Sequence, residues 1–427
     1  MERSSAISSA TASPTTTTKQ GVPPSTRSAK PRLDGIYAGV VFVGIACSVL
    51  LVLGLSVAFL PMARTPGAWR IFPHNPWLDG YVRWDAGWYR TIASQGYSYQ
   101  AHGQSSVAFF PGYPTLARLA APFVGGPERA GIAITFVSGL VAALLFHRWC
   151  AQRMSTAASK IAVWVLLLYP FAFYLFGPVY ADATFLAAVL GAFVLLDADH
   201  PVWAGLVGAV ATATRPIGII VTIGLVLRMI ERRGLIRFPV RSSATTDGTE
   251  RRARRPSLNF RELRWTDAGV LISAGGLVAY CLLLWRRFGH PFAFITAQEA
   301  WGQAPGPATW LKFEVVRAFR RPALDVEHIR MAAPAIFCVV AIALLPAVVR
   351  RFGWAYATYA GLVVLIPGLS SGDFTGVGRY LLAAFPFFAA AGDLAARRPR
   401  LAVPGLALSG AVMWFFASLY GRWYYIS

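Results

Sequence analysis

Asp85, a carboxylate in aromatic surroundings, is the residue of this chain best suited to catalysis. It is the only acidic residue in the stretch Arg83 to Pro114, and its neighbours are Trp84, Trp88 and Tyr89. A carboxylate within reach of a hydroxyl can act as a general base, and aromatic rings can stack on a sugar and exclude water. The same residues also fit an N-cap aspartate that opens an interfacial helix with aromatic belt residues. The two roles are compatible.

Two arginines, Arg215 and Arg379, stand at the ends of predicted membrane spans. Arg215 precedes Pro216 between two short apolar runs, and Arg379 precedes Tyr380 after a glycine-rich stretch. A guanidinium near the hydrocarbon is costly without a partner, and a lipid phosphate is a natural anionic partner. Such a phosphate needs cationic stabilisation when it leaves. Interfacial snorkelling is the alternative explanation for both arginines.

Further residues could bind a substrate. Asp182, in the sequence Y-A-D-A after Tyr180, opens an apolar span, where a helix N-cap is the simpler role. Gln298, Glu299 and Trp301 could contact sugar hydroxyls, although an amphipathic helix in a loop would have the same pattern.

Motifs for metals and nucleotides are missing from the sequence. The histidines form no i, i+4 pair, and the cysteines, expected to be buried small apolar residues, have no C-x-x-C spacing; these are Cys47, Cys150, Cys281 and Cys338. The sequence contains neither a P-loop nor G-x-G-x-x-G. We therefore expect no bound metal and no cofactor.

The composition places these residues in a membrane protein. Of 427 residues, 56% are hydrophobic and 14% charged, with a mean hydropathy of +0.51, values outside the range of soluble domains. The net charge of +21 comes from arginines between apolar runs, where they fix topology. Nucleic-acid binding is thus not expected, and membrane lipids are the expected partners of the basic segments.

About ten to eleven helices are predicted. Residues 1–34 are rich in Ser, Thr and Pro, so we expect a disordered cytoplasmic tail, followed by a multi-span domain over 35–427. Spans of roughly 20 apolar residues are expected near 36–61, 130–149, 160–177, 180–197, 201–214, 216–230, 267–286, 331–349, 354–369, 380–395 and 401–420. The two short runs around Arg215 could instead form one kinked span or a shallow hairpin.

The distribution of basic residues predicts the topology. With the N-terminus in the cytoplasm, the Arg-rich loop 228–264 and most other basic connections lie inside. The loops 62–129 and 287–330 then lie outside. Asp85, Asp182, Arg215, the stretch 294–302, and Asp373 with Arg379 share that outer side, which indicates an extracytoplasmic site at the bilayer surface of the plasma membrane. Within the first loop, residues 115–124 are predicted to form an amphipathic helix on the membrane.

With these residues identified, the chain resembles the PIG-V type of mannosyltransferases, which includes glycosylphosphatidylinositol mannosyltransferase II and bacterial relatives. The matching segments occur in order over Arg83 to Pro386. They are W-D-A-G-W-Y-R-T-I-A-S-Q-G-Y, F-F-P-G-Y-P, Y-P-F-A-F-Y-L-F-G-P-V-Y-A-D-A-T-F, A-T-R-P-I-G, F-G-H-P-F-A-F-I-T-A-Q-E-A-W-G and G-R-Y-L-L-A-A-F-P.

The resemblance implies an all-α polytopic fold of the GT-C glycosyltransferase class, with the acidic catalytic residue in a long first extracytoplasmic loop. It implies a polyprenyl-phosphate sugar donor, usually mannose, and inversion at the anomeric carbon. Asp85 takes the place of the family's acidic residue. The other family positions, with roles assigned from their chemistry, are Arg215 and Arg379 for the donor phosphate and Tyr180, Asp182, Gln298 and Trp301 for the substrates. Trp84, Trp88 and Tyr89, beside Asp85, are further candidates for substrate binding.

Two departures from the family pattern stand out. The family often has Asn-Pro-Ala where this chain has Tyr169-Pro170-Phe171, and Glu where it has Asp182. The Ala- and Arg-rich composition indicates a GC-rich bacterium, so the family name does not identify the acceptor, which is a lipid or a glycan. A lipid-linked sugar flippase is the alternative function, but such transporters often have internal repeats and none is found. A membrane scaffold is a third possibility.

Overall fold

The computed structural model describes residues 31–64, 69–101, 103–237, 257–258, 262–301, 306–320 and 326–427. In these ranges the chain is helical, apart from one antiparallel pair of two-residue strands, β1 (Ile236–Arg237) and β2 (Ser257–Leu258). The predicted all-α fold is confirmed. Of the predicted tail and the Arg-rich loop, residues 1–30, 238–256 and 259–261 lie outside the described residues.

Five helical segments in the described part of the chain are long and apolar enough to cross a membrane. They are the Gly35–Phe59 part of α1 (Pro31–Phe59), α5 (Pro127–Ala151), η5 with α10 (Trp265–Ala274 and Gly275–Phe288), the His328–Phe352 part of α14 (Val326–Phe352), and α18 (Pro399–Gly421). Outer helices expose large apolar side chains, such as Val339 at 67% and Leu408 at 68%. This pattern fits a surface that faces lipid tails, and the chain is a multi-pass membrane protein.

The other predicted spans correspond to shorter helices. These are α6 (Thr156–Leu167), α7 (Asp182–Asp197), α8 (Pro201–Thr214), α9 (Ile219–Arg232), α15 (Trp354–Ser370) and α17 (Phe385–Ala396). The span predicted at 160–177 is wrong in its second half, because the helix ends at Leu167 and the chain continues into the short 3₁₀ helix η2 (Ala172–Leu175). Pro170 explains the break, since proline disfavours helix in the residue before it.

The chain around Arg215 forms two antiparallel helices. Arg215 joins α8 to the 3₁₀ turn η3 (Pro216–Gly218) in an extended conformation, with φ of −151° and ψ of 147°, as expected before a proline. Arg215 pairs with Asp182 at the start of α7, whereas Arg228 of α9 pairs with Asp197 at the end of α7. The chain therefore reverses at Arg215, and the alternative of one kinked span is wrong.

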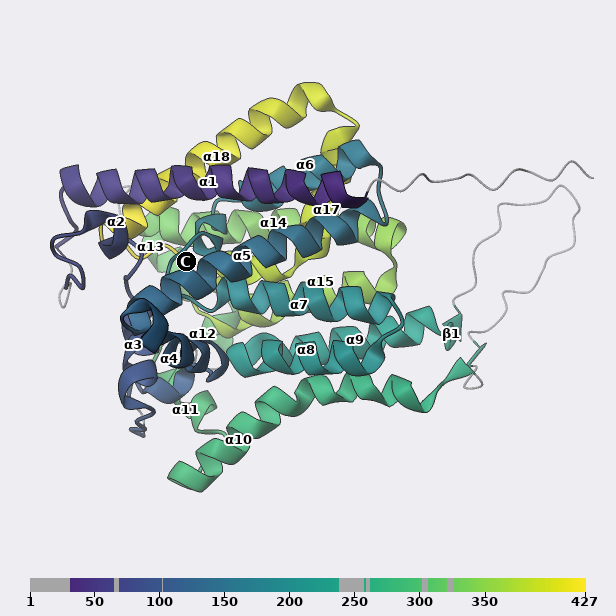
Figure 1. Cartoon of the computed structure of the whole chain (residues 1–427), viewed down its shortest axis with the longest axis horizontal. Helices are drawn as coiled ribbons and strands as arrows, with labels where there is room; N and C mark the ends of the chain where they lie inside the picture. The colour runs from purple at the N-terminus through teal and green to yellow at the C-terminus, as the bar shows by residue number, and fades with distance from the viewer. Residues whose placement is uncertain are drawn as a thin grey trace, which may run out of the picture.

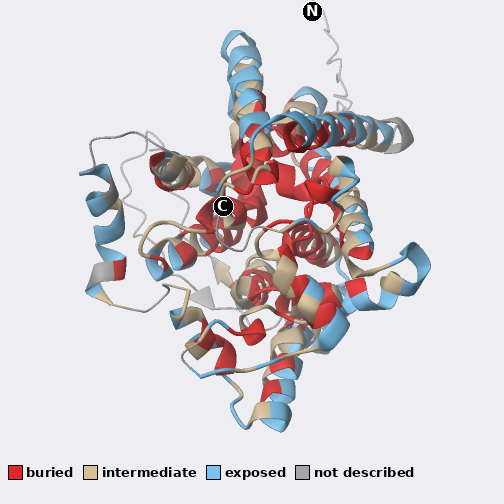
Figure 2. Cartoon of the chain, turned by 90° about the vertical axis from the view of Figure 1, so that its left-hand side faces the viewer, coloured by how far each residue is buried: buried red, intermediate tan, exposed pale blue. Residues whose placement is uncertain are grey.

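Helix α7 lies at the centre of the bundle, between α5 and α8 (Figure 1). Close approach of the helices depends on small residues. A Cβ atom on Gly139 of α5 would lie 2.1 Å from the Leu175 carbonyl oxygen, and one on Gly205 of α8 would lie 1.9 Å from the Gly269 carbonyl oxygen. Figure 2 shows buried residues in the middle and exposed residues along the outer helices. The cysteines are free, but Cys47 is exposed on α1, so its predicted burial is wrong.

Short helices gather at one end of the bundle, at the left of Figure 1. They come from the two long loops and from the segment before α17. They are α2 (Pro76–Asp79), α3 (Ala86–Gln95), η1 (Ser106–Ala108), α4 (Gly112–Val124), α11 (Ala293–Glu299), α12 (Pro307–Trp310), α13 (Phe313–Phe319), α16 (Val377–Tyr380) and η6 (Leu381–Ala383). The helix predicted at 115–124 is part of α4, with Leu119 and Phe123 exposed; its contact with the membrane remains a prediction.

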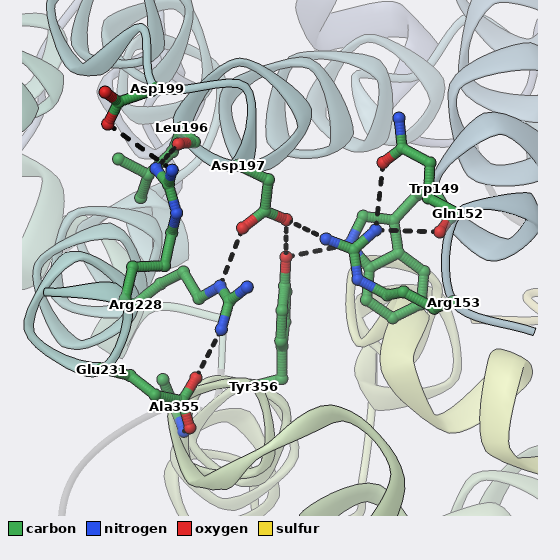
Figure 3. Close-up of polar contacts among 11 residues, drawn as sticks. Trp149, Gln152, Arg153, Leu196, Asp197, Asp199, Arg228, Glu231, Ala355 and Tyr356 are labelled. Atoms are coloured by element: carbon green, nitrogen blue, oxygen red, sulfur yellow. Dashed lines mark hydrogen bonds and ion pairs between the residues drawn. The ribbon is translucent and has the colours of Figure 1, made fainter. Parts of the chain in front are cut away.

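A network of partly buried charges closes the opposite end of the bundle (Figure 3). The Asp197 carboxylate at the end of α7 accepts hydrogen bonds from Arg153, from Nε of Arg228 at 2.8 Å and from the hydroxyl of Tyr356 at 2.5 Å. Arg228 also binds Glu231, which accepts the backbone N–H of Ala355. Helices α5, α7, α9 and α15 are thereby joined through two carboxylates and two guanidiniums, whose charges balance.

Candidate active site

A pocket of about 110 Å³ lies at the end of the bundle that carries the short helices. Its lining residues come from six separate parts of the chain. They are Asp85, Tyr89, Ala108, Phe109, Phe110, Thr214, Arg215, Pro216, Gln298, Trp301, Thr375, Gly376, Arg379, Tyr380 and Tyr425. Six of the ten predicted site residues are thus brought together, namely Asp85, Tyr89, Arg215, Gln298, Trp301 and Arg379.

Four charged side chains form a continuous chain beside this pocket. Nη2 of Arg379 lies 3.2 Å from Oδ2 of Asp85, and Nη1 of Arg379 lies 3.8 Å from Oδ2 of Asp182. The same Asp182 oxygen accepts a hydrogen bond from Arg215. Asp182 is the most deeply buried of the four, with a side chain only 1% exposed. Its carboxylate therefore holds both arginines in place from beneath the pocket.

Asp85 is held by its backbone while part of its carboxylate stays open. It occupies the N-cap position of α3, yet its side chain makes no capping hydrogen bond. Its backbone N–H instead donates to the hydroxyl of Tyr180 at 3.1 Å. Within the described residues, the hydrogen bond from Arg379 goes to Oδ2, and Oδ1 has none. Burial raises the pKa of Asp85, and the positive charge of Arg379 opposes that rise. An open, partly desolvated carboxylate can accept a proton from a bound hydroxyl.

Three buried donors that belong to the pocket lining have no hydrogen-bond acceptor among the described residues. They are Nε of Arg215, Nε of Arg379 and the indole Nε1 of Trp301. Buried polar groups in native structures are nearly always paired, so unsatisfied donors around one pocket require an explanation. An anionic ligand with several oxygen atoms, such as a phosphate, would satisfy them.

The predicted aromatic residues take two different positions. Tyr89 lines the pocket, whereas Trp88 lies behind it, stacked on Phe109 with ring centroids 5.7 Å apart and also in edge contact with Trp301. Trp84 lies outside the lining and packs against the end of the chain. Trp88 and Trp84 thus support the walls of the pocket, and only Tyr89 of the three is placed to meet a ligand directly.

Tyr180 and Asp182 lie beneath the pocket and outside its lining. The Tyr180 ring is fully buried, with the guanidinium of Arg379 4.8 Å from its centroid. Asp182 is the first residue of α7, where Ala181 is the N-cap, and its carboxylate binds arginines. The geometry gives both residues a positioning role toward Arg379.

Asp373 stabilises the loop that leads to Arg379. Its carboxylate lies 2.9 Å from Arg330 and accepts the backbone N–H of Thr375 at 3.0 Å. Desolvation alone would raise the pKa of Asp373, but its hydrogen bonds and the charge of Arg330 hold the pKa below its ordinary value. The ionised side chain fixes the turn that brings Thr375 and Gly376 to the pocket.

The segment after α18 was not predicted as part of the site. Tyr425 lines the pocket, close to both Asp85 and Arg379. Local sequence gives no signal for this, because aromatic residues after a membrane helix are typical of an interfacial belt. In the described part of the chain, no group of three or more His, Cys, Asp or Glu side chains is arranged to hold a metal ion.

Searches against protein-family models and against curated proteins give no match. Solved structures with a similar arrangement include ArnT from Cupriavidus metallidurans bound to undecaprenyl phosphate, with 14% identity, a TM-score of 0.48, and coverage of 90% of this chain and 75% of that one. The oligosaccharyltransferase of Archaeoglobus fulgidus in its apo form has 12% identity, a TM-score of 0.45, and coverage of 90% and 56%. The same organism's AglB, in complex with an inhibitory peptide and a dolichol-phosphate, has 12% identity, a TM-score of 0.44, and the same coverage. This chain thus spans about half the length of the archaeal enzyme.

Proposed function

We propose that this protein is a membrane glycosyltransferase that moves a mannose-type sugar from a polyprenyl-phosphate donor to a lipid or glycan acceptor. The observation that carries the proposal is the open carboxylate of Asp85 in a pocket that also holds Arg215 and Arg379. Acceptor activation needs a base, and departure of a lipid phosphate needs cations. This pocket contains both.

In the proposed reaction, Asp85 accepts the proton of the acceptor hydroxyl. The acceptor oxygen forms a bond to the anomeric carbon as the bond from that carbon to the phosphate oxygen breaks, with inversion. The electron pair of the broken bond stays on the lipid phosphate, whose growing negative charge Arg215 and Arg379 stabilise. Asp182 keeps both guanidiniums in position, so little reorganisation is required during the reaction.

The choice of sugar rests on the ordered motifs that resemble PIG-V type mannosyltransferases. Gln298 and Trp301 line the pocket and can contact sugar hydroxyls or phosphate oxygens. The distribution of arginines supports an extracytoplasmic pocket, because Arg228, Arg232 and Arg233 at the end of α9 lie at the opposite end of the bundle, where basic residues indicate the cytoplasm.

Transfer of radiolabelled mannose tests this function. Purified protein in lipid nanodiscs is incubated with polyprenyl-phosphate-[³H]mannose and extracted bacterial lipids or glycans. The wild type should produce a labelled acceptor, and Asp85→Asn should not. Full transfer by Asp85→Asn would exclude Asp85 as the base. Lack of wild-type transfer with every acceptor, together with movement of the labelled lipid across a vesicle membrane, would favour the flippase.

A further inference from the structure

The chain after α18 folds back against the active site. The Tyr174 hydroxyl, which is buried, donates a hydrogen bond to the carbonyl oxygen of Ile426 at 2.6 Å. The backbone N–H of Gly376, a pocket-lining residue, donates to Oγ of Ser427 at 3.1 Å. The segment Trp423–Ser427 is therefore fixed to the core and to the loop before α16.

The segment begins with a tryptophan in a conformation that favours glycine. Trp423 has φ of +71°, directly after the C-cap residue of α18. Its N–H donates to the Tyr420 carbonyl at 3.1 Å, and the N–H of Tyr424 donates to the Leu419 carbonyl at 3.0 Å. These two bonds define a Schellman motif, in which glycine is the usual residue at this position. A tryptophan here is strained, so the contacts of its ring must maintain it.

Those contacts reach the residue directly before Asp85. Trp84 also has a left-handed backbone, with φ of +53°. Its ring centroid lies 5.6 Å from that of Trp423 and 5.0 Å from that of Tyr425, and its Nε1 donates to the Tyr424 carbonyl at 3.3 Å. Two strained aromatic residues thus pack against each other beside the candidate base.

Arg83 adds a second connection. This fully buried residue donates from Nε to the Gly421 carbonyl at 2.9 Å and from Nη2 to Oδ2 of Asp79 at 2.7 Å. Its guanidinium carbon lies 5.1 Å from the ring centroid of Trp423. Both residues that precede Asp85 are therefore held by the end of α18 and the segment after it.

We propose that Trp423 and Tyr425 are positioning residues that fix Trp84, and through it Asp85, for the reaction, and that Tyr425 also contacts the bound sugar phosphate. The proposal rests on the proposed transferase function. Tyr425 lines the pocket, which places its side chain where a substrate would bind. Burial raises the pKa of Tyr425, so its hydroxyl stays protonated and able to donate a hydrogen bond.

Trp423→Gly is a sharp test because glycine accepts the left-handed backbone while the ring is removed. In nanodiscs, its kcat should fall about tenfold to a hundredfold with little change in the donor KM, because Asp85 loses its alignment. The acid limb of its pH–rate profile should move as well, and Trp423→Phe, which keeps a ring, should recover most of the activity. Unchanged kcat per folded protein in Trp423→Gly would overturn the positioning role.

Tyr425→Phe tests the substrate contact, with Tyr424→Phe as the matched control. Tyr424 is the neighbouring tyrosine; its ring packs near Arg422 and lies outside the pocket lining. Loss of the Tyr425 hydroxyl should raise the donor KM about tenfold, while Tyr424→Phe should match the wild type. Equal KM values for the two variants would contradict the contact.

Hydrogen exchange separates this proposal from the proposed function. The backbone N–H groups of residues 85–89 should exchange faster in Trp423→Gly than in the wild type, with or without substrates. If residues 85–89 exchanged at the same rate in Trp423→Gly and in the wild type, the proposed positioning of Asp85 by Trp423 would be wrong, even if the wild type transfers sugar. Faster exchange in a protein whose wild type transfers nothing would overturn the transferase function alone.

Discussion

The Arg379 guanidinium lies 3.2 Å from the Asp85 carboxylate, although 294 positions separate the two residues in the chain. Arg379 also reaches Asp182, which in turn holds Arg215. The candidate base and the two candidate phosphate ligands are therefore parts of one charge network. Changes to any member should affect the others in predictable ways.

Asp85→Asn should reduce the transfer rate by about 10²-fold to 10⁴-fold, the usual contribution of a general base. The amide is nearly the same size as the carboxylate, so binding of the donor should persist. Steady-state kinetics together with a binding measurement for undecaprenyl phosphate would check this. A large loss of lipid binding with a normal rate at saturation would instead assign Asp85 to the donor site.

The pH–rate profile should show an acid limb above the ordinary carboxyl pKa of about 4. Burial raises the pKa of Asp85, and a base works only when ionised. Activity should therefore fall as the pH drops through this raised pKa. A profile of kcat/KM against pH provides the measurement, and an acid limb below pH 4 would contradict it.

Arg379→Gln should move that acid limb to higher pH. The charge of Arg379 lowers the pKa of Asp85, so its removal lets the pKa rise further. Arg153→Gln is a control, because Arg153 is a paired arginine of the network at the other end of the bundle. Arg153→Gln should leave the acid limb of the pH–rate profile at the wild-type pH. Equal shifts of the acid limb in Arg379→Gln and Arg153→Gln would indicate a general effect on folding and contradict the role of Arg379.

Asp182→Asn and Asp197→Asn form a matched pair, since each aspartate lies at one end of α7 and binds two arginines. Removal of either carboxylate leaves arginines unpaired, and Asp182 is buried whereas Asp197 is partly buried, so Asp182→Asn should lose about 3 kcal/mol of stability and Asp197→Asn less. Only Asp182→Asn should also lose transfer activity per folded protein. Thermal unfolding in detergent would measure the stabilities, and transfer kinetics would be measured below the Tm of the less stable variant. Equal activities of Asp182→Asn and Asp197→Asn would contradict the positioning role of Asp182.

The orientation of the bundle can be tested by cysteine labelling. In a cysteine-free background, Gln95→Cys on α3 and Arg398→Cys before α18 both place a thiol at an exposed position. An impermeant maleimide should label position 95 in intact cells and position 398 only after the membrane is opened. The reverse pattern would place the pocket in the cytoplasm and contradict the proposed extracytoplasmic reaction.

The sequence by itself determined the membrane class, most of the helices and the main charged residues of the pocket. Apolar runs form helices and prolines interrupt them through local interactions, so the positions of most helices can be predicted from residues that are close in the sequence. Asp85 was recognisable because it is the only carboxylate among aromatic residues in the stretch Arg83 to Pro114. Arg215 was recognisable because a guanidinium between two short apolar runs needs an anionic partner. The sequence did not decide whether the chain reverses at Arg215, because two short apolar runs fit more than one arrangement.

Only the tertiary structure decided how those residues work together. It placed Asp182 between two arginines, where its local position had favoured a helix N-cap, and it turned Trp84 from the pocket toward Trp423. It also brought Tyr425 to the site from the segment after α18. Apart from the Asp182–Arg215 pair, these contacts join residues far apart in the chain. All of them depend on helix packing, which local periodicity does not encode.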